Sequence, residues 1–93
     1  MFKKEQKIEY SNHNGQTFKT AIVITGAKTA RIGIAAEYKY VTLKLGIESI
    51  DWELVQQSLH HTDNGDFAVL EIRTKEGAVK TYHFNITEFF NKF

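Results

Sequence analysis

The sequence predicts a single α+β domain over residues 1–93, with the order β-β-α-β-β-β-α and a mainly antiparallel sheet. A chain of 93 residues is long enough for one hydrophobic core and too short for two. Apolar residues alternate before residue 25 and after residue 52, and recur with helical spacing between these stretches. Two Asn-Gly pairs, each a strong hairpin signal, lie between runs of strand-forming residues. We therefore expect one main helix packed on one face of the sheet.

The first two strands are predicted at residues 7–10 and 18–25, where apolar and polar side chains alternate. Asn14 and Gly15 lie between them, and both residue types tolerate the positive φ of a tight turn. This pattern predicts a first hairpin. A short helix over residues 2–8 is the alternative interpretation of the N-terminus.

The main helix is predicted over residues 29–45, with Thr29 as its N-cap and Gly46 just beyond its end. Residues 30–36 also alternate like a strand, so the start of the helix is open to either interpretation. The second half has only the helical period. Its apolar face consists of residues three or four apart: Ile34, Tyr38, Val41 and Leu45.

Three further strands are predicted at residues 52–61, 67–74 and 78–85. A two-residue turn at Asn64-Gly65 would pair Leu59 with Leu70. For the next turn, a loop ending in a bulged Gly77 pairs Leu70 with Tyr82 and is preferred to a two-residue loop, because it keeps the apolar residues together. The resulting core face contains Val55, Leu59, Leu70, Ile72, Tyr82 and Phe84.

A short closing helix is predicted over residues 87–93, with Asn85 as its N-cap and Phe89, Phe90 and Phe93 available for burial. The segment Phe84-Asn85-Ile86-Thr87-Glu88-Phe89-Phe90, after the meander, resembles small uncharacterised bacterial α+β proteins with an F-[ND]-I-T-x-F-F pattern. The resemblance implies the same fold and implies no particular chemistry.

Charge and composition exclude several classes of protein. Twelve Lys and Arg against eleven Asp and Glu give a net charge of +1, which argues against a nucleic-acid or membrane-surface binder. The charge is uneven, because residues 1–46 hold eight basic and three acidic residues and residues 47–93 hold four and eight. With no cysteine, disulfides and thiolate sites are excluded. Residues 1–7 lack the apolar run of a signal peptide, so a cytoplasmic protein is expected.

One metal site can be derived from the predicted register. His60 and His83 would flank Val69 on the sheet face opposite the core, with Glu71 one step along the central strand. Two imidazoles and a carboxylate are a common ligand set for transition metals. Polar residues on a solvated face are the more ordinary explanation of the same pattern.

An anion site is suggested by Lys28 and Thr29 at the predicted start of the helix, where backbone N–H groups attract negative charge. The surrounding sequence lacks the glycines of a phosphate loop, because Ala27 precedes the lysine. At most a single small anion is expected here.

The pattern as a whole favours a non-catalytic interaction or regulatory module, because no catalytic motif is recognisable. The second sheet face is predicted to carry Leu54, Phe67, Val69 and Val79, too many apolar residues to leave bare. A protein partner or a second copy is the expected cover, with no cofactor, nucleic acid or membrane. The alternative is a small-ligand or metal-binding domain, or an enzyme, that uses His60, Glu71 and His83.

Overall fold

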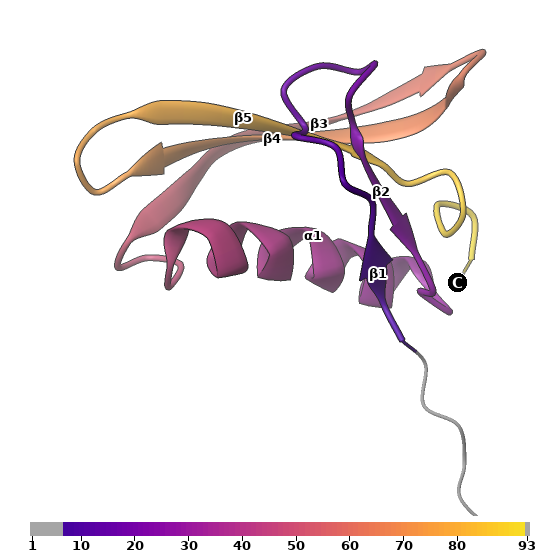
Figure 1. The fold of residues 1–93 in the computed structure, drawn as a ribbon, viewed down its shortest axis with the longest axis horizontal. Helices are drawn as coiled ribbons and strands as arrows, with labels where there is room; N and C mark the ends of the chain where they lie inside the picture. The colour runs from indigo at the N-terminus through magenta and orange to yellow at the C-terminus, as the bar shows by residue number, and fades with distance from the viewer. Residues whose placement is uncertain (1–6, 93) are drawn as a thin grey trace, which may run out of the picture.

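The computed structural model describes residues 7–92 and shows a five-stranded sheet with one long helix along one face (Figure 1). The sheet has the order β1-β2-β5-β4-β3, and only the β2–β5 pair is parallel. The predicted α+β domain with a mostly antiparallel sheet is therefore confirmed. Its elements are β1 (Glu9–Tyr10), β2 (Ile22–Thr25), α1 (Ala30–Leu45), β3 (Trp52–Thr62), β4 (Gly65–Thr74) and β5 (Val79–Asn85).

Helix α1 begins and ends as its sequence predicts. The Thr29 hydroxyl accepts a hydrogen bond from the Ile32 N–H at 3.2 Å, and Gly46, at φ 111°, follows the last helical residue. Trp52, at the start of β3, is buried and donates its indole N–H to the Gly46 carbonyl at 2.9 Å. The Trp52 contact ties the C-terminal end of α1 to the core.

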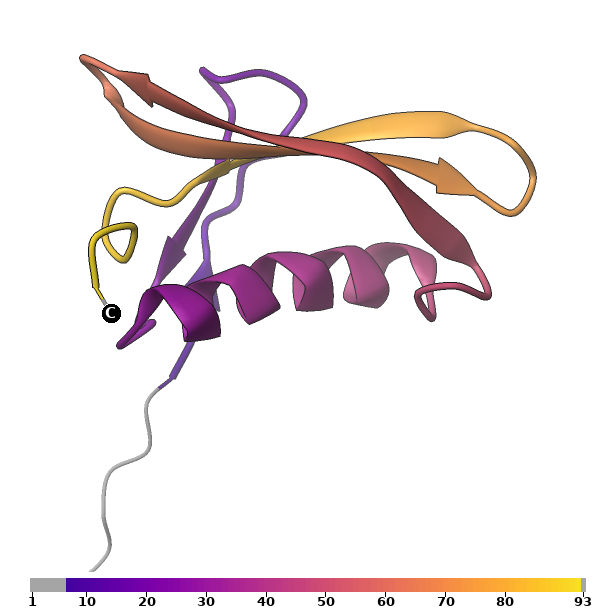
Figure 2. The same ribbon diagram turned by 180° about the vertical axis from the view of Figure 1, so that it is seen from behind.

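The core lies between α1 and the sheet, as Figures 1 and 2 show from opposite sides. The largest fully buried side chains come from every layer of the fold: Trp52, Phe84, Phe89, Ile22, Ile24, Leu70, Ile72 and Val41. The predicted core residues Leu70, Ile72 and Phe84 are among them. The predicted core residues Val55 and Leu59 are exposed, since Val55 lies at a β-bulge and both lie on β3, the edge strand of the sheet.

The predicted register between β4 and β5 is confirmed. Leu70 lies opposite Tyr82, and Ala68 lies opposite Phe84. Gly77 has φ 94° in the connecting turn, which suits the bulged loop that the sequence indicates.

The predicted register between β3 and β4 is wrong by two residues, because Leu59 lies opposite Ala68. The turn residues are Asp63 and Asn64, and Gly65 instead begins β4 opposite Thr62. Gly65 is needed there because a Cβ at this position would lie 2.5 Å from the Thr87 hydroxyl oxygen. A shift of two residues keeps each side chain on its predicted face.

A β-bulge between Leu54 and Gln56 changes the face on which Leu54 lies. Leu54 pairs with Ile72 and packs against the core, so its predicted place on the second sheet face is wrong. Strict alternation along β3 could not reveal the bulge.

The N-terminal hairpin is confirmed as a pairing of strands and differs in its connection. Tyr10 lies opposite Ile24 in the β1–β2 pair, but residues 11–21 form a long loop in place of a tight turn. This loop rises over the face of the sheet opposite α1 (Figure 1). The alternative helix over residues 2–8 lies mostly outside the described residues, and its last two members are neither helix nor strand.

The predicted C-terminal helix is not present within the described residues. After β5 the chain forms turns over residues 87–91. Asn85 caps the first turn, since its side-chain oxygen accepts from the Thr87 N–H at 3.0 Å, but the segment is too short to continue as a helix. Phe89 is buried as expected, and Phe93 lies outside the described residues. No helix within residues 7–92 has the length and apolar character to cross a membrane.

Candidate functional site

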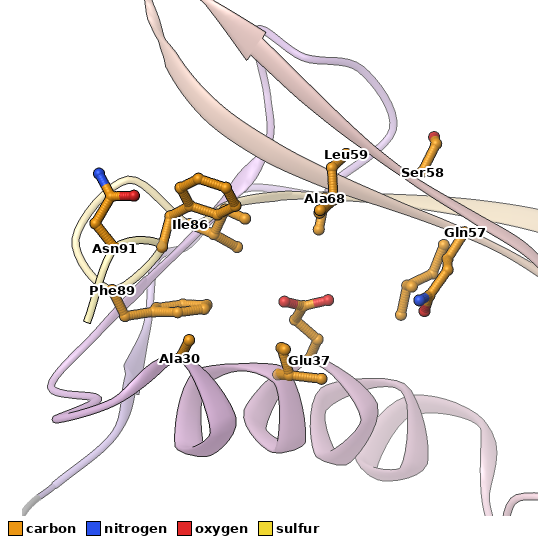
Figure 3. Close-up of a pocket in the computed structure, with 12 residues that line it drawn as sticks. Ala30, Glu37, Gln57, Ser58, Leu59, Ala68, Ile86, Phe89 and Asn91 are labelled. Atoms are coloured by element: carbon orange, nitrogen blue, oxygen red, sulfur yellow. The ribbon is translucent and has the colours of Figure 1, made fainter. Parts of the chain in front are cut away.

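A cavity of about 290 Å³ lies between the N-terminal half of α1 and the β3–β4 hairpin, with the turn after β5 at one end (Figure 3). Its lining is mainly apolar and comes from three parts of the chain: Ala30, Ile34, Glu37, Gln57, Ser58, Leu59, Ala68, Leu70, Ile86, Phe89, Phe90 and Asn91. One wall of the cavity is β3, the edge strand of the sheet. Ile34 and Leu59, 50% and 58% exposed, lie at its open side.

Glu37 is the only ionisable residue in this lining. Glu37 is only 3% exposed, and its carboxyl group points from α1 toward the sheet, into the cavity (Figure 3). Gly33 and Val41, one turn away on either side, are also buried, so Glu37 lies on the inner face of the helix. Its carboxyl group has no hydrogen-bond partner among residues 7–92. Its oxygen atoms stay accessible from the cavity, because no side-chain polar atom of these residues is both fully buried and without a partner.

Burial raises the pKa of Glu37 from its ordinary 4.5 to about 8. The physical cause is desolvation, since burial in this mainly apolar lining disfavours the charged form of the carboxyl group. The neighbouring Tyr38 hydroxyl also has a raised pKa, first through burial and then through the charges of Glu37 and Glu48. At neutral pH the Glu37 side chain is therefore mostly a neutral carboxylic acid, which both donates and accepts hydrogen bonds.

The other polar groups around the cavity have defined positions. The Tyr38 hydroxyl donates to the Gln57 side-chain oxygen at 2.7 Å and so links α1 to β3. Ser58 points away from the helix, toward the opposite face of the sheet (Figure 3). The polar group that faces the cavity from α1 is thus the Glu37 carboxyl alone.

The sequence contained a signal for Glu37 that the predicted helical face overlooked. Glu37 lies three residues after Ile34 and four before Val41, which places it on the same face as both. A carboxyl on an otherwise apolar stripe indicates a buried acid. The predicted apolar face already had helical spacing through Ile34 and Tyr38, so Glu37 was not counted as part of it.

The structure does not bring His60, Glu71 and His83 together as a metal site. His60 lies opposite Phe67, because of the two-residue register shift, and only His83 lies opposite Val69. No group of three or more His, Cys, Asp or Glu side chains within residues 7–92 is arranged to hold a metal ion.

The Phe18 ring of the 11–21 loop occupies the place between the two histidines. It packs edge-on against His60 at 5.1 Å and against His83 at 4.8 Å between ring centroids. Each imidazole has another partner as well. His60 Nε2 lies 2.9 Å from the Ser58 hydroxyl, and His83 Nδ1 lies 2.9 Å from the Gly15 carbonyl oxygen.

The predicted anion site at Lys28 and Thr29 is filled by groups of the chain itself. The Thr29 hydroxyl takes the Ile32 N–H, and the Lys92 carbonyl accepts from the Ala30 N–H. The Glu88 carboxylate accepts from the Gly26 N–H at 2.7 Å and adds a negative charge close by. These internal acceptors use the donors that an anion would need.

The second sheet face is also less bare than its sequence suggests. Phe67 is only 5% exposed, because the Phe18 ring packs against it at 5.4 Å between centroids. Val69 is partly buried, and Val79 remains exposed near the end of the sheet. With Leu54 on the core face, the four predicted interface residues do not form one exposed patch.

Comparison of the chain with protein-family models, with curated proteins and with solved structures found no match.

Proposed function

We propose that this protein is a non-catalytic binding domain for a small, mainly apolar molecule, held in the cavity between α1 and the β3–β4 hairpin. The observation that carries the proposal is the Glu37 carboxyl group, which belongs to a residue only 3% exposed, has no hydrogen-bond partner among the described residues and is accessible from an apolar cavity. A polar group that loses most of its hydration and gains no hydrogen bond from the protein costs stability. A ligand that supplies the partner removes that cost.

The size of the cavity suits a ligand of about one aromatic ring with substituents. Apolar cavities of about 150 Å³ hold benzene, and drug-sized ligands occupy about 300–1,000 Å³. The observed 290 Å³ lies at the lower end of this range. Ile34 and Leu59 at the open side would close over such a molecule.

The lining favours binding over catalysis. General acid–base or nucleophilic catalysis ordinarily needs a second group within hydrogen-bond reach of the first. Among the lining residues Glu37 is the only ionisable side chain, and Ser58 points away from it. A single carboxyl in an apolar space orients a ligand through one hydrogen bond.

The proposal is tested by NMR titration of the ¹⁵N-labelled full chain with toluene. We expect saturable shifts at the amides of Ile34, Leu59 and Phe89, which line the cavity. Ala68→Leu extends a side chain into the cavity and should weaken binding at least tenfold. Ala78→Leu, the same change at an exposed turn residue outside the lining, is the matched control and should bind normally. Shifts that are absent, or identical in Ala68→Leu, contradict the proposal.

A second candidate function, self-association, is favoured by the outer edge of β3. This strand has 11 residues and, within the described part of the chain, pairs with β4 and otherwise forms only an isolated bridge between Trp52 and Glu48. Unpaired edge strands attract further strands, and an antiparallel β3–β3 contact is self-complementary about a two-fold axis. Leu59, exposed beside that edge, would be covered in such a homodimer. The bulge at Val55 confines regular pairing to residues 57–62.

Sedimentation velocity over a wide range of concentrations tests this candidate. We expect a dimer that Leu59→Lys converts to a monomer. Leu43→Lys is the control, since Leu43 is exposed on α1 away from the strand edge. A monomer at every concentration would remove the homodimer.

A further inference from the structure

We propose that the cavity selects an uncharged ligand whose carbonyl oxygen accepts a hydrogen bond from the Glu37 carboxyl group. This inference rests on the proposed function and names the chemical class of its ligand. It concerns the polar end of the ligand, whereas the apolar lining of the cavity selects the rest of the ligand.

The first step is the charge of the site. No Lys, Arg or His contributes to the lining from α1, from β3 and β4 or from the turn after β5. An anionic ligand would therefore have no cation to pair with, in a space where an unpaired charge is costly. Anions are excluded by this lining.

The second step separates uncharged from cationic ligands. Glu37 is 3% exposed, and its carboxyl is mostly protonated at neutral pH because its pKa is about 8. A cation would have to displace that proton and lose its own hydration, and buried ion pairs often fail to recover this cost. A carbonyl oxygen accepts the O–H of the acid as it stands. Carboxylic acids held neutral in apolar sites are known to donate such hydrogen bonds.

The third step concerns the other ionisable groups that face Glu37. From α1, the Tyr38 side chain interacts with the Glu37 charge, and its hydroxyl is held by Gln57. The strands and the turn that complete the lining contribute no ionisable side chain. Loss of the Glu37 proton is thus the titration that changes the polar end of the cavity between pH 6 and pH 9.

Four probes of nearly the same shape test the inference on the full chain at pH 7, with affinities measured by NMR titration. Acetophenone offers a carbonyl, α-methylstyrene replaces the oxygen by CH₂, benzamidine is a cation and benzoate is an anion. We expect acetophenone to bind roughly 5- to 10-fold tighter than α-methylstyrene, as one hydrogen bond implies. Benzamidine and benzoate should bind more weakly than α-methylstyrene.

Two variants connect the preference to Glu37. Glu37→Leu should abolish the advantage of acetophenone over α-methylstyrene while both still bind. In the unmodified protein, acetophenone affinity should fall about three- to fivefold between pH 7 and pH 9, since most of the O–H donor is lost as Glu37 ionises. Glu37→Gln, whose amide N–H donates at every pH, should keep the preference and lose the pH dependence.

The outcomes distinguish the inference from the function on which it rests. Equal affinities for acetophenone and α-methylstyrene, or tightest binding of benzamidine, overturn the inference and leave an apolar binding site. A preference that survives in Glu37→Leu overturns the role of Glu37. If neither toluene nor any of the four probes binds in the cavity, the proposed function and the inference both fail.

Discussion

The Phe89 ring packs directly on Gly33, at the one point on the inner face of α1 where the helix has no side chain. A Cβ built at Gly33 would overlap three atoms of this ring. The close approach holds the turn after β5 against the helix and forms one end of the cavity. Gly33 is thus required by contact rather than by backbone conformation.

Gly33→Ala is expected to destabilise the protein by about 1–3 kcal/mol, because the added methyl group forces Phe89 out of its place. In an exposed helix the same change would stabilise by about 1 kcal/mol. Urea denaturation measures the difference. Phe89→Ala is the second arm of a double-mutant cycle, since it removes the ring that the methyl group meets. If Gly33→Ala destabilises equally in both backgrounds, the contact with Phe89 is not the cause.

The two faces of the central strand β4 should respond differently to truncation. Leu70 is fully buried in the core, so Leu70→Ala should lower the free energy of unfolding by about 2–5 kcal/mol. Val69 lies on the opposite face and is only partly buried, so Val69→Ala should lower the free energy of unfolding by less. Chemical denaturation of the two variants decides, and a greater loss at Val69 would reverse the assignment of faces.

Phe18→Ala is expected to destabilise the fold by about 1–2 kcal/mol although Phe18 is 44% exposed. The ring covers Phe67 and contacts both His60 and His83, so its loss exposes the second sheet face. Val79→Ala, on the same face and without this role, should change the free energy of unfolding by less than about 0.5 kcal/mol. Equal effects in thermal denaturation would mean that the 11–21 loop does not protect the sheet.

The pH dependence of stability should carry the signature of Glu37. Its pKa is raised in the folded state from 4.5 to about 8, so between these values the folded protein binds more protons than the unfolded chain. Stability therefore falls as pH rises through this window, by at most about 1.4 kcal/mol per pH unit. Below pH 4.5 this contribution is constant.

Glu37→Gln should remove that slope and be more stable than the unmodified protein at pH 8, because the amide cannot ionise. Urea denaturation at pH 5, 6.5 and 8 measures both proteins. Exposed Glu53→Gln is the matched control and should retain the slope of the unmodified protein. A slope that persists in Glu37→Gln would assign the dependence to another group.

Local chemistry accounts for what the sequence predicted correctly. Helix α1 begins after Thr29, whose hydroxyl accepts a hydrogen bond from the Ile32 N–H. It ends before Gly46, whose backbone N–H donates to the Thr42 carbonyl. The β4–β5 register follows from the three-residue turn and from the alternation that puts Leu70 and Phe84 on one face. These features depend on neighbours in the chain, so periodicity and turn type are enough to find them.

The candidate site depends on contacts between distant segments, and the sequence could not define it. Thr87 meets Gly65, and the β3–β4 turn lies one residue earlier than predicted, which shifts the register by two residues. Phe18 separates the histidines that alternation had placed together. The bulge beside Leu54 depends on how β3 pairs with β4, and the cavity depends on how α1, the β3–β4 hairpin and the turn after β5 meet.

By itself, then, the sequence determined the fold class, the main helix and the side chains of the β4–β5 core, because each arises from spacing along the chain. Only the tertiary structure decided which polar group faces an apolar cavity. Glu37 was visible as an acid on the inner stripe of α1, but its burial depends on β3, β4 and the turn at Phe89 meeting around it. Packing of segments far apart in sequence creates that environment, and the environment determines the protonation of Glu37.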